Sequence, residues 1–486
     1  MMRSFCLEPR QLPPAAAASI RRLQPLFHKL YVGLARDVDF LSAALAPPST
    51  SAGGSSSSSN CAWLEHELAT FRELAPSAAA KPHLLLPNSV YLQPAAGSAL
   101  DPGLDRADDA QALTLSVGNV QAGEPYQMQL VHTLQCAEHG ESVQSGPLRH
   151  VCRTLAQAAR LVHPSAPCVA ILAKPLELLA LRTRCDVRGL GESLRTEHGV
   201  QTVLYLSIDE LAQATVSDQT GDLCLGPHRI SVVYIRYDFS HPFGEHVRAG
   251  DEQVMHAGER GALLQREWRA VEAMERSTAV LSSSLGSRLA HRRRVQHALV
   301  SQPGALERFV NDDEARMLRA VLPMQWAVGG DGYESEAAEA RARFEADPER
   351  FVAKSALRPR TGSNATQDRK ASGGVTLTSA ESIRQVLASP AAAWFLLYPK
   401  VTPQPHNAHI VHDGGVHQFD MDDTPAASEV AAYGTYLSAP LDDGGEVLVD
   451  ACAGLGARTR PADPAHPLAA GLGYGALSCV AVDDGS

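Results

Sequence analysis

The chain has 486 residues, of which 44% are hydrophobic and 5% aromatic, and it carries 54 Asp and Glu against 43 Lys and Arg. At ~150 residues per domain, this length corresponds to about three structural units and is ample for a sizeable core. The net charge of -11 argues against a protein whose main task is to coat nucleic acid, which needs a basic balance. A basic phosphate pocket inside the acidic chain remains compatible with these numbers.

Membrane and targeting signals are weak. A transmembrane helix needs ~18 or more uninterrupted apolar residues, and the best candidate, Cys168–Leu181, is interrupted by Lys174, Pro175 and Glu177. The N-terminus lacks the apolar segment of a secretory signal. We therefore expect a cytoplasmic protein, with an organelle transit peptide as the alternative. The nine cysteines form no C-x-x-C pair, which favours reduced thiols over a disulfide framework.

Helical and strand patterns alternate along the chain. Ser207 with Glu210 resembles a capping box that follows a strand. Flexible segments are expected at 1–24, 46–60 and 357–374, which are rich in Pro, Ala, Gly or Ser. Helices are expected at 25–45, 265–281 and 285–300, and strands at 169–173, 200–206, 230–235, 350–353, 394–397, 409–411 and 446–449. This alternation predicts an α/β protein.

Basic residues stand at the ends of two predicted strands. In open α/β sheets, ligands lie beyond the carboxyl ends of the strands. Arg236 follows the apolar run VVYI, where its planar guanidinium suits a carboxylate; a surface salt bridge is the alternative. Lys354 ends RFVAK before the Gly/Ser-rich segment, an arrangement that suits nucleotide phosphates although it is not a Walker A loop. A basic surface loop is the alternative there.

Two later segments give weaker signals. The run Phe395–Val401 either presents backbone groups to an adenine edge or is an ordinary strand before a Pro-x-Pro turn. Arg458 and Arg460 are two residues apart in an extended segment, so their side chains are expected to point the same way, toward an anionic ligand.

Two further clusters have ordinary interpretations. A candidate metal cluster consists of His406, His409, His412, His417 and Asp413. The spacing of His409 and His412 places them on opposite faces of a strand, and Asp413–Gly415 predicts a hairpin turn. The run Arg292–Arg294 is interpreted as a phosphate-facing or solvated patch on a helix rather than a nucleic-acid site.

The order of the segments resembles the eukaryotic-type glutathione synthetase family. That family has a VVYFRDGY-like strand, a W-x-x-R-x-x-x-E-R-S helix, L-A-G-T-K-K-V-Q and P-G-x-L-E, and here VVYIRYDF, Trp268 with ERS, LAHRRRVQHAL and PGALERF follow in that order. Downstream, RFVAK, FLLYPKVTPQP, SEVAAYGTYL, GARTR and LAAG are similar to RFVLKPQREGGGNN, ILMEKIEPEP, SELGIFGVYV, LLRTK and VAAG. The similarity extends over residues 25–483 and is best after residue 230.

The resemblance implies an ATP-grasp fold with an inserted α/β substrate-binding domain and a lid. It also implies a homodimeric ligase that uses ATP and Mg²⁺ to join γ-glutamylcysteine to glycine through an acyl phosphate. The chain then divides into a flexible extension (1–24), a first ATP-grasp part (25–163, with a disordered loop at 46–60), a substrate-binding domain (164–300) and a nucleotide-binding region with its lid (301–486). Small molecules, not nucleic acid or membrane, are the expected partners.

The resemblance also assigns roles to individual residues. Arg236 would hold a substrate carboxylate, and Arg458 corresponds to the catalytic, substrate-binding arginine of R-T-K. ATP contacts fall at five positions: Arg293, Lys354, Lys400, Glu429 and Arg460. Ala469 and Ala470 correspond to the substrate-facing V-A positions. At positions 293 and 460 the family has lysines, so arginine keeps the charge but changes the geometry.

The metal ligands depart from the family pattern. The Gly-rich loop has lost its acidic ligand and leaves Asn364 as an approximate substitute, and the family's E-I-N-T-I-S segment becomes Ser116–Gln121, with Asn119 as its nearest match. Hard divalent cations prefer charged oxygen ligands. This loss favours a second hypothesis, a catalytically degenerate pseudoenzyme of the same fold that acts as a binding or partner subunit. A basic-loop nucleic-acid binder is a third hypothesis, and the acceptor is left open between glycine, β-alanine and serine.

Overall fold

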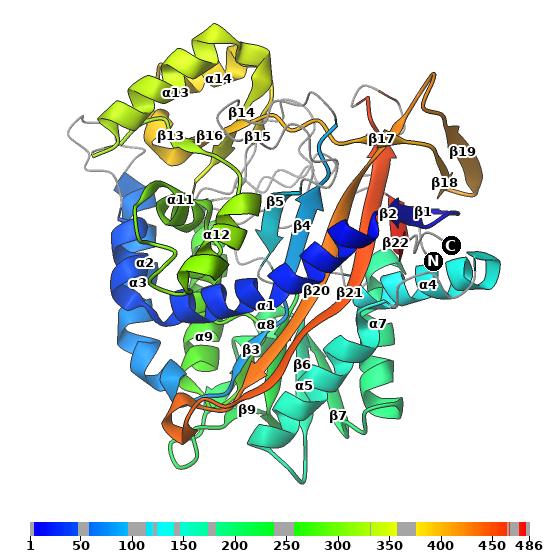
Figure 1. The fold of residues 1–486 in the computed structure, drawn as a ribbon. Coiled ribbons are helices and arrows are strands. Elements are labelled where there is room, and N and C mark those ends of the chain that lie inside the picture. Colours follow the sequence, from blue (N-terminus) through cyan, green and yellow to red (C-terminus); the bar gives the residue numbers. More distant parts are fainter. Residues whose placement is uncertain are drawn as a thin grey trace.

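A long antiparallel hairpin runs diagonally through the molecule, between a small upper lobe and a parallel sheet below (Figure 1). This computed structural model describes residues 4–46, 58–95, 113–119, 124–139, 146–173, 181–237, 257–330, 332–356, 376–463, 466 and 476–482. Helices pack on several sheets, which confirms the predicted α/β class. Within these ranges, no helix is both long enough and apolar enough to cross a bilayer.

The largest sheet has 11 strands and is built around β20 (Ala426–Ser438) and β21 (Val447–Pro461). Its main order is β19-β18-β1-β22-β21-β20-β4-β5, with β2, β3 and β17 paired to it at the sides. Alternate residues face opposite sides, so Ala432 and Leu455 pack toward α1 (Pro14–Arg36), while Tyr433 packs toward α4 (Pro125–His139). The other strands are β1 (Ser4–Cys6), β2 (Arg10–Leu12), β3 (His83–Leu85), β4 (Asn88–Leu92), β5 (Thr114–Asn119), β17 (Pro405–His406), β18 (Ala408–His412), β19 (Gly415–Phe419) and β22 (Ala476–Val482).

A second sheet is parallel and has four strands in the order β12-β11-β6-β7. Its strands are β6 (Cys168–Leu172), β7 (Thr202–Leu206), β11 (Val232–Ile235) and β12 (Val280–Leu281). All five residues of β6 are buried, as expected for a parallel strand covered on both faces. One face is covered by α5 (Leu148–Val162) and α7 (Leu181–Thr196), and the other by α8 (Ile208–Leu211) and α9 (Ala257–Arg276).

The upper lobe holds a third sheet in the order β13-β16-β14-β15. Phe344 and Ile383 join helices α13 and α14 to its core. The lobe consists of β13 (Trp326–Ala327), α13 (Glu334–Ala346), β14 (Phe351–Ser355), β15 (Thr376–Leu377), α14 (Ala380–Leu387) and β16 (Phe395–Pro399). Elsewhere lie α2 (Val38–Ala44), α3 (Ser58–Ala79), α10 (Leu285–Ala290), α11 (Arg293–Ser301), α12 (Asp312–Val321) and the small sheet of β8 (Thr215–Val216), β9 (Leu223–Leu225) and β10 (His228–Ile230).

The N-terminal region differs from its prediction. Residues 4–24, expected to be flexible, form β1, β2 and the first half of α1, with Ile20 and Leu23 in the core. The Ala-rich run favours helix, and Pro14 is tolerated in its first turn. The predicted helix 25–45 is divided into α1 and α2 at Asp37, whose carboxylate caps α2 by accepting a hydrogen bond from the Phe40 backbone N at 2.9 Å. Most of 46–60 and all of 357–374 lie outside the described residues.

Other predicted elements agree with the structure to within a few residues. Strands 169–173, 200–206, 350–353, 394–397, 409–411 and 446–449 correspond to β6, β7, β14, β16, β18 and the start of β21. The capping box is confirmed, because the Ser207 hydroxyl and the Glu210 carboxylate each accept a hydrogen bond from the other's backbone N. The predicted hairpin turn is also confirmed, with positive φ at Asp413 and Gly414 between β18 and β19.

Three predicted boundaries were wrong. The strand 230–235 is interrupted at Ser231, which separates β10 from β11. The helix 265–281 ends at Arg276, and its last predicted residues form β12 instead. The helix 285–300 is two helices, because Arg292 has an extended conformation at the cap of α11. In each case, tertiary packing overrides a continuous local pattern.

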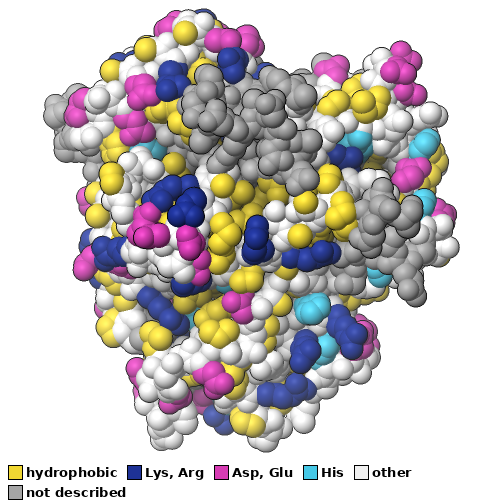
Figure 2. All heavy atoms as spheres, in the orientation of Figure 1, with side chains coloured by type: hydrophobic (Ala, Val, Ile, Leu, Met, Phe, Trp, Pro, Cys, Tyr) yellow, Lys and Arg dark blue, Asp and Glu magenta, His cyan; other side chains and the backbone are white. Residues whose placement is uncertain are grey.

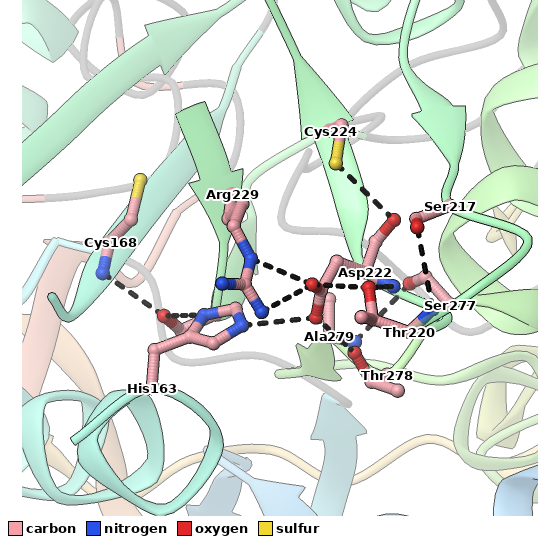
Figure 3. A network of polar contacts seen from close by, with 11 residues as sticks. His163, Cys168, Ser217, Thr220, Asp222, Cys224, Arg229, Ser277, Thr278 and Ala279 are labelled. Carbon is pink, nitrogen blue, oxygen red and sulfur yellow. Dashed lines mark hydrogen bonds and ion pairs between the residues drawn. The ribbon is translucent and has the colours of Figure 1, made fainter. Parts of the chain in front are cut away.

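A polar network ties the end of α5 to the small sheet and to β11 (Figure 3). His163 Nε2 lies 3.0 Å from Asp222 Oδ1, and its Nδ1 lies 2.9 Å from the Ser231 hydroxyl. Asp222 also accepts hydrogen bonds from Thr220 Oγ1 at 2.6 Å and Arg229 Nε at 2.7 Å. Ser231 is fully buried and accepts a backbone hydrogen bond from β6. A substrate therefore has no access to this Ser–His–Asp arrangement, and the network links structural elements.

We expect Asp222→Asn to destabilise the protein in a pH-dependent way. Burial by itself would raise the pKa of Asp222, but hydrogen bonds from Thr220, His163 and Arg229 lower it to about 2. The ionised group therefore contributes stability that is present above the unfolded-state pKa of ~3.9 and is lost as pH falls through the folded-state pKa. The free energy of unfolding at pH 7 should fall by about 2 kcal/mol in urea titrations, with a weaker acid dependence below pH ~4. Asp218→Asn, exposed in the same turn, should change stability by less than ~0.5 kcal/mol; equal losses would contradict this account.

Candidate functional site

Two predicted nucleotide-binding cations lie beside Tyr398 in the upper lobe. Lys354 Nζ on β14 is 4.5 Å from the centroid of the Tyr398 ring on β16. Arg293, the first residue of α11, is 6% exposed and donates from Nη1 to the Ser355 carbonyl at 2.8 Å. Burial raises the pKa of Tyr398, and the Arg293 charge opposes that shift. The two cations therefore meet at the end of β14, since Arg293 binds the carbonyl of Ser355, the residue after Lys354.

Lys400 lies apart from that pair. Lys354 is opposite Leu396 in the antiparallel register, whereas Lys400 follows the end of β16 and its backbone N donates to the Arg350 carbonyl at 2.7 Å. The four-residue offset corresponds to roughly 13 Å along a strand. The exposed Lys400 side chain therefore stands at the opposite end of this strand pair.

Arg236, at the carboxyl end of β11, forms a buried ion pair with Asp186 of α7. Arg236 Nη1 lies 2.7 Å from Asp186 Oδ2, and the two side chains are 9% and 1% exposed. Asp186 also accepts hydrogen bonds from the backbone N of Tyr126 at 2.8 Å and of Gln127 at 3.2 Å, in the first turn of α4. Burial raises the pKa of Asp186, and Arg236 opposes that shift. The expected alternative of a surface salt bridge is thus replaced by a buried pair.

Arg458 on β21 contacts a second carboxylate, Glu124, which directly precedes α4. Arg458 Nη2 lies 3.1 Å from Glu124 Oε2, and the side chains are 15% and 13% exposed. Glu124 has φ of 63°, a left-handed conformation that non-glycine residues adopt rarely and that is concentrated at functional sites. Burial raises the pKa of Tyr433, with Arg458, Glu124 and Asp186 all acting on it. The Arg236 and Arg458 pairs also meet in space, because Asp186 binds the backbone N of Tyr126, two residues after Glu124.

Glu429 and Arg460 extend these pairs along the hairpin. The register pairs Glu429 with Arg458, and Arg458 and Arg460 share a face because they are two residues apart. Arg460 Nη2 lies 3.8 Å from Glu429 Oε1. We call the whole set the arginine–carboxylate cluster: Arg236, Arg458, Arg460, Asp186, Glu124 and Glu429.

The sequence analysis missed Asp186 and Glu124. Asp186 is 50 residues from Arg236, and Glu124 is 334 residues from Arg458, so no local spacing connects the partners. The only sequence signal is an acidic residue before Pro125 and an aspartate inside a predicted helical stretch. Asp186 and Glu124 matter because, with Glu429, they supply one carboxylate for each arginine of the cluster. The cluster is therefore balanced in charge.

Four predicted positions are not placed against this cluster. Asn119 ends β5 opposite Asn88, and its side chain lies outside the described part of the chain. Asn364, Ala469 and Ala470 are also outside the described residues. Their assigned roles remain predictions.

The described carboxylates do not fit Mg²⁺, which the resemblance implies. The described residues contain no group of three or more His, Cys, Asp or Glu side chains that could hold a metal ion. Asp186, Glu124 and Glu429 each face an arginine. A divalent cation there would meet a like charge at ~4 Å, which is unfavourable at low dielectric. We therefore derive no chemical step through a metal at this cluster.

The Arg292–Arg294 run is not the solvated patch that was one of its two interpretations. The three residues are 2%, 6% and 7% exposed. Arg292 pairs with Glu67 of α3, and Arg294 donates from Nη1 to the Ala393 carbonyl at 3.3 Å. The five donors of a guanidinium permit such burial against carboxylate and carbonyl oxygens. Among the side chains of described residues in Figure 2, Lys and Arg lie among hydrophobic, acidic and neutral ones and form no continuous basic surface.

His406 on β17 and the two histidines of β18 take separate partners. His406 Nε2 lies 2.6 Å from the Ser428 hydroxyl. His409 Nδ1 lies 2.6 Å from a Glu8 carboxylate oxygen, and His412 Nδ1 lies 2.7 Å from the Ser4 hydroxyl. The His409 and His412 contacts tie β18 to the N-terminal strand region, while His406 ties β17 to β20.

Comparison with known proteins gives matches over most of the chain. Residues 114–481 match the family described as eukaryotic glutathione synthase, ATP binding domain. Glutathione synthetase, chloroplastic, of Solanum lycopersicum is 26% identical over 288 residues, which cover 57% of this chain and 43% of that protein. The Arabidopsis thaliana protein of the same name is 23% identical over 316 residues, covering 63% and 48%. The chain thus matches about half the length of these relatives.

One solved structure is similar over almost the whole chain. It is described as a glutathione synthetase-like effector from Globodera pallida in its apoform, with a TM-score of 0.63 at 15% identity. The match covers 99% of this chain and 91% of that protein. At this identity the likeness concerns the fold, and it agrees with the glutathione-synthetase-type ATP-grasp architecture expected from the sequence.

Asp186→Asn should strongly destabilise the arginine–carboxylate cluster. The variant preserves the shape of the side chain but leaves the buried Arg236 without its counter-charge, which costs about 3 kcal/mol in comparable pairs. Urea unfolding should register a loss of that order. Glu192→Gln on the same helix is the matched control, because its ion pair with Arg195 is exposed (65% and 39%) and should contribute less than ~1 kcal/mol. Similar losses of unfolding free energy in the two variants would show that the buried pair stabilises the protein no more than the exposed pair does.

Proposed function

Because the chain belongs to the eukaryotic glutathione synthase family, we propose that it is an ATP-dependent ligase that joins γ-glutamylcysteine to glycine. The family match over residues 114–481 supports the ligase class. The convergence of Arg236 and Arg458 in one cluster supports the substrate class, since both were assigned to substrate from the family motifs. An arginine fork suits two carboxylate oxygens, and a peptide substrate with free carboxylates supplies such groups.

The proposed chemistry divides between the two groups of cations. Lys354 and Arg293 would face the nucleotide phosphates, where positive charge stabilises the transferring phosphoryl group. Arg236 and Arg458 would orient the dipeptide so that its reacting carboxylate accepts the phosphoryl group, and the glycine amine would then displace phosphate from the acyl phosphate. Substrate carboxylates would have to displace Asp186 and Glu124 from the arginines or share the arginines with them. Use of Mg²⁺, a homodimeric assembly and a cytoplasmic location stay predictions from the resemblance.

A degenerate pseudoenzyme is the second candidate, and a specific observation favours it. The substrate arginines already have internal carboxylate partners, and the described residues contain no group of metal-ligating side chains. A protein with this cluster could keep the fold and bind partners without turning over ATP.

An assay of ADP formation separates these two functions. Purified full-length protein is incubated with ATP, Mg²⁺, γ-glutamylcysteine and glycine, and each component is omitted in turn. The ligase predicts ADP release that requires both the dipeptide and the amino acid. Absence of substrate-dependent ADP would overturn the ligase and leave the family fold intact. Thermal stabilisation by ATP that requires magnesium would count against the pseudoenzyme, and replacing glycine by β-alanine or serine identifies the acceptor.

Lys354→Ala should remove activity with little effect on stability. If the ammonium contacts ATP phosphate, its loss should lower kcat at least ~100-fold, as for other groups that stabilise transition-state charge. Its contact with the Tyr398 ring contributes only about 0.5–1 kcal/mol to folding, so the melting temperature of ligand-free protein should change little. Lys29→Ala, which removes a partly exposed ion pair with Glu314, should leave ADP formation unchanged. A large stability loss in Lys354→Ala would identify a structural lysine instead.

A further inference from the structure

A pocket of about 170 Å³ lies between the end of α1, α3, β3 and the end of α9. The labels of α3, β3 and α9 locate these elements in Figure 1. Its walls are mostly apolar and include Phe71, Leu74, Leu281 and Leu285. None of the residues assigned to ATP or substrate lines it. The pocket is therefore distinct from the arginine–carboxylate cluster and from the cations of the upper lobe.

Three nitrogen-bearing side chains line the pocket: Arg36, Lys81 and His83. Arg36 is the last residue of α1, and burial lowers the pKa of its guanidinium. Among the residues that the structure describes, no hydrogen bond or ion pair engages the Arg36 side chain; the group acting on it electrostatically is Tyr436. The half-buried Arg36 guanidinium therefore keeps its N–H donors available for a ligand.

His83 adds a second polar group that lacks a partner. Burial and the nearby Arg36 charge lower the pKa of His83 to about 3, so its imidazole is neutral at pH 7. Its Nε2 is shielded from solvent and has no hydrogen-bond partner among the described residues. Since Nε2 is inaccessible, a ligand in the pocket would not contact it, and His83 contributes an uncharged wall beside Arg36.

The remaining charged groups leave the pocket with a basic excess. Lys81 donates from Nζ to the backbone carbonyls of Met274 at 3.3 Å and of Glu275. Burial lowers the pKa of Lys81, and the charge of the Glu275 carboxylate opposes that shift. The Glu275 carboxylate accepts a hydrogen bond from the Leu285 backbone N and lies 4.0 Å from Arg288. The lining therefore carries two cations, Arg36 and Lys81, against the single carboxylate of Glu275, which also faces Arg288 outside the lining.

We propose that this pocket binds a small organic monocarboxylate with an apolar body. The planar guanidinium of Arg36 suits the two carboxylate oxygens, and Lys81 adds positive charge to the same lining. Phe71, Leu74 and Leu281 bury the hydrocarbon part of the ligand, which is the usual division between anchor and apolar wall in small-molecule sites. The site is additional to the proposed ligase function and does not depend on it.

The proposal is tested by calorimetric titration of the full chain with hexanoate, hexanamide and inorganic phosphate. Hexanoate should bind and raise the melting temperature. Hexanamide has the same shape without the charge and should bind at least ~10-fold more weakly, because it loses the charge-assisted hydrogen bonds. Phosphate should not compete. Equal binding of acid and amide, preference for phosphate, or no binding of hexanoate would each overturn the proposal.

Two variants with matched controls locate the site. Arg36→Gln should raise the Kd for hexanoate at least ~10-fold, while Arg22→Gln, exposed on the same helix, should not change it.

Leu441→Asp places a negative charge at the pocket lining from a side chain that is 40% exposed, so this variant should fold and bind hexanoate more weakly. Val447→Asp, 51% exposed at the start of β21, is its control. Unchanged affinity in Leu441→Asp would place hexanoate elsewhere, and Lys354→Ala should retain hexanoate binding even if it lacks ATP turnover.

Discussion

The buried pairing of arginines with carboxylates is the constraint on which the junction of this fold depends. Arg236 joins the parallel sheet to Asp186, which also accepts hydrogen bonds from the first turn of α4. Arg458 joins the long hairpin to Glu124, directly before the same helix. The start of α4 is thus held from two sheets at once. Guanidinium groups below the surface need such partners, because an uncompensated buried charge is strongly destabilising.

The same pairing affects what the site can do. An anionic substrate would be attracted by the arginines but would compete with carboxylates that already balance them. A net-neutral cluster therefore gives little long-range steering, and any affinity must come from short, well-oriented hydrogen bonds. Under the proposed function, a working ligase would require substrate and nucleotide to reorganise these contacts, whereas a pseudoenzyme would not. Several arginines of this acidic chain are thus buried against internal partners, as are those of the Arg292–Arg294 run.

Local patterns in the sequence predicted much of the fold. Strands such as β6 and β7, the Ser207–Glu210 capping box and the Asp413–Gly414 turn follow from adjacent residues and were found. Features that depend on distant partners were missed. The Ala-rich start of α1 was interpreted as flexible because the core that buries Ile20 comes from elsewhere in the chain. The division between α10 and α11 was missed as well, since Arg292 there pairs with Glu67, 225 residues away.

The sequence by itself determined the family, the α/β class and the order of basic residues along the chain, because these are carried by short motifs whose chemistry is local. Only the tertiary structure decided which cations are paired, which are buried and which line a pocket. Charge balance and burial arise between groups that are far apart in the chain, as with Arg458 and Glu124 or with Arg36 and His83. The net charge argued against a nucleic-acid coat because it is a property of the whole chain. Whether an individual arginine is paired or free to bind a ligand depends on the carboxylate or pocket that the fold places beside it.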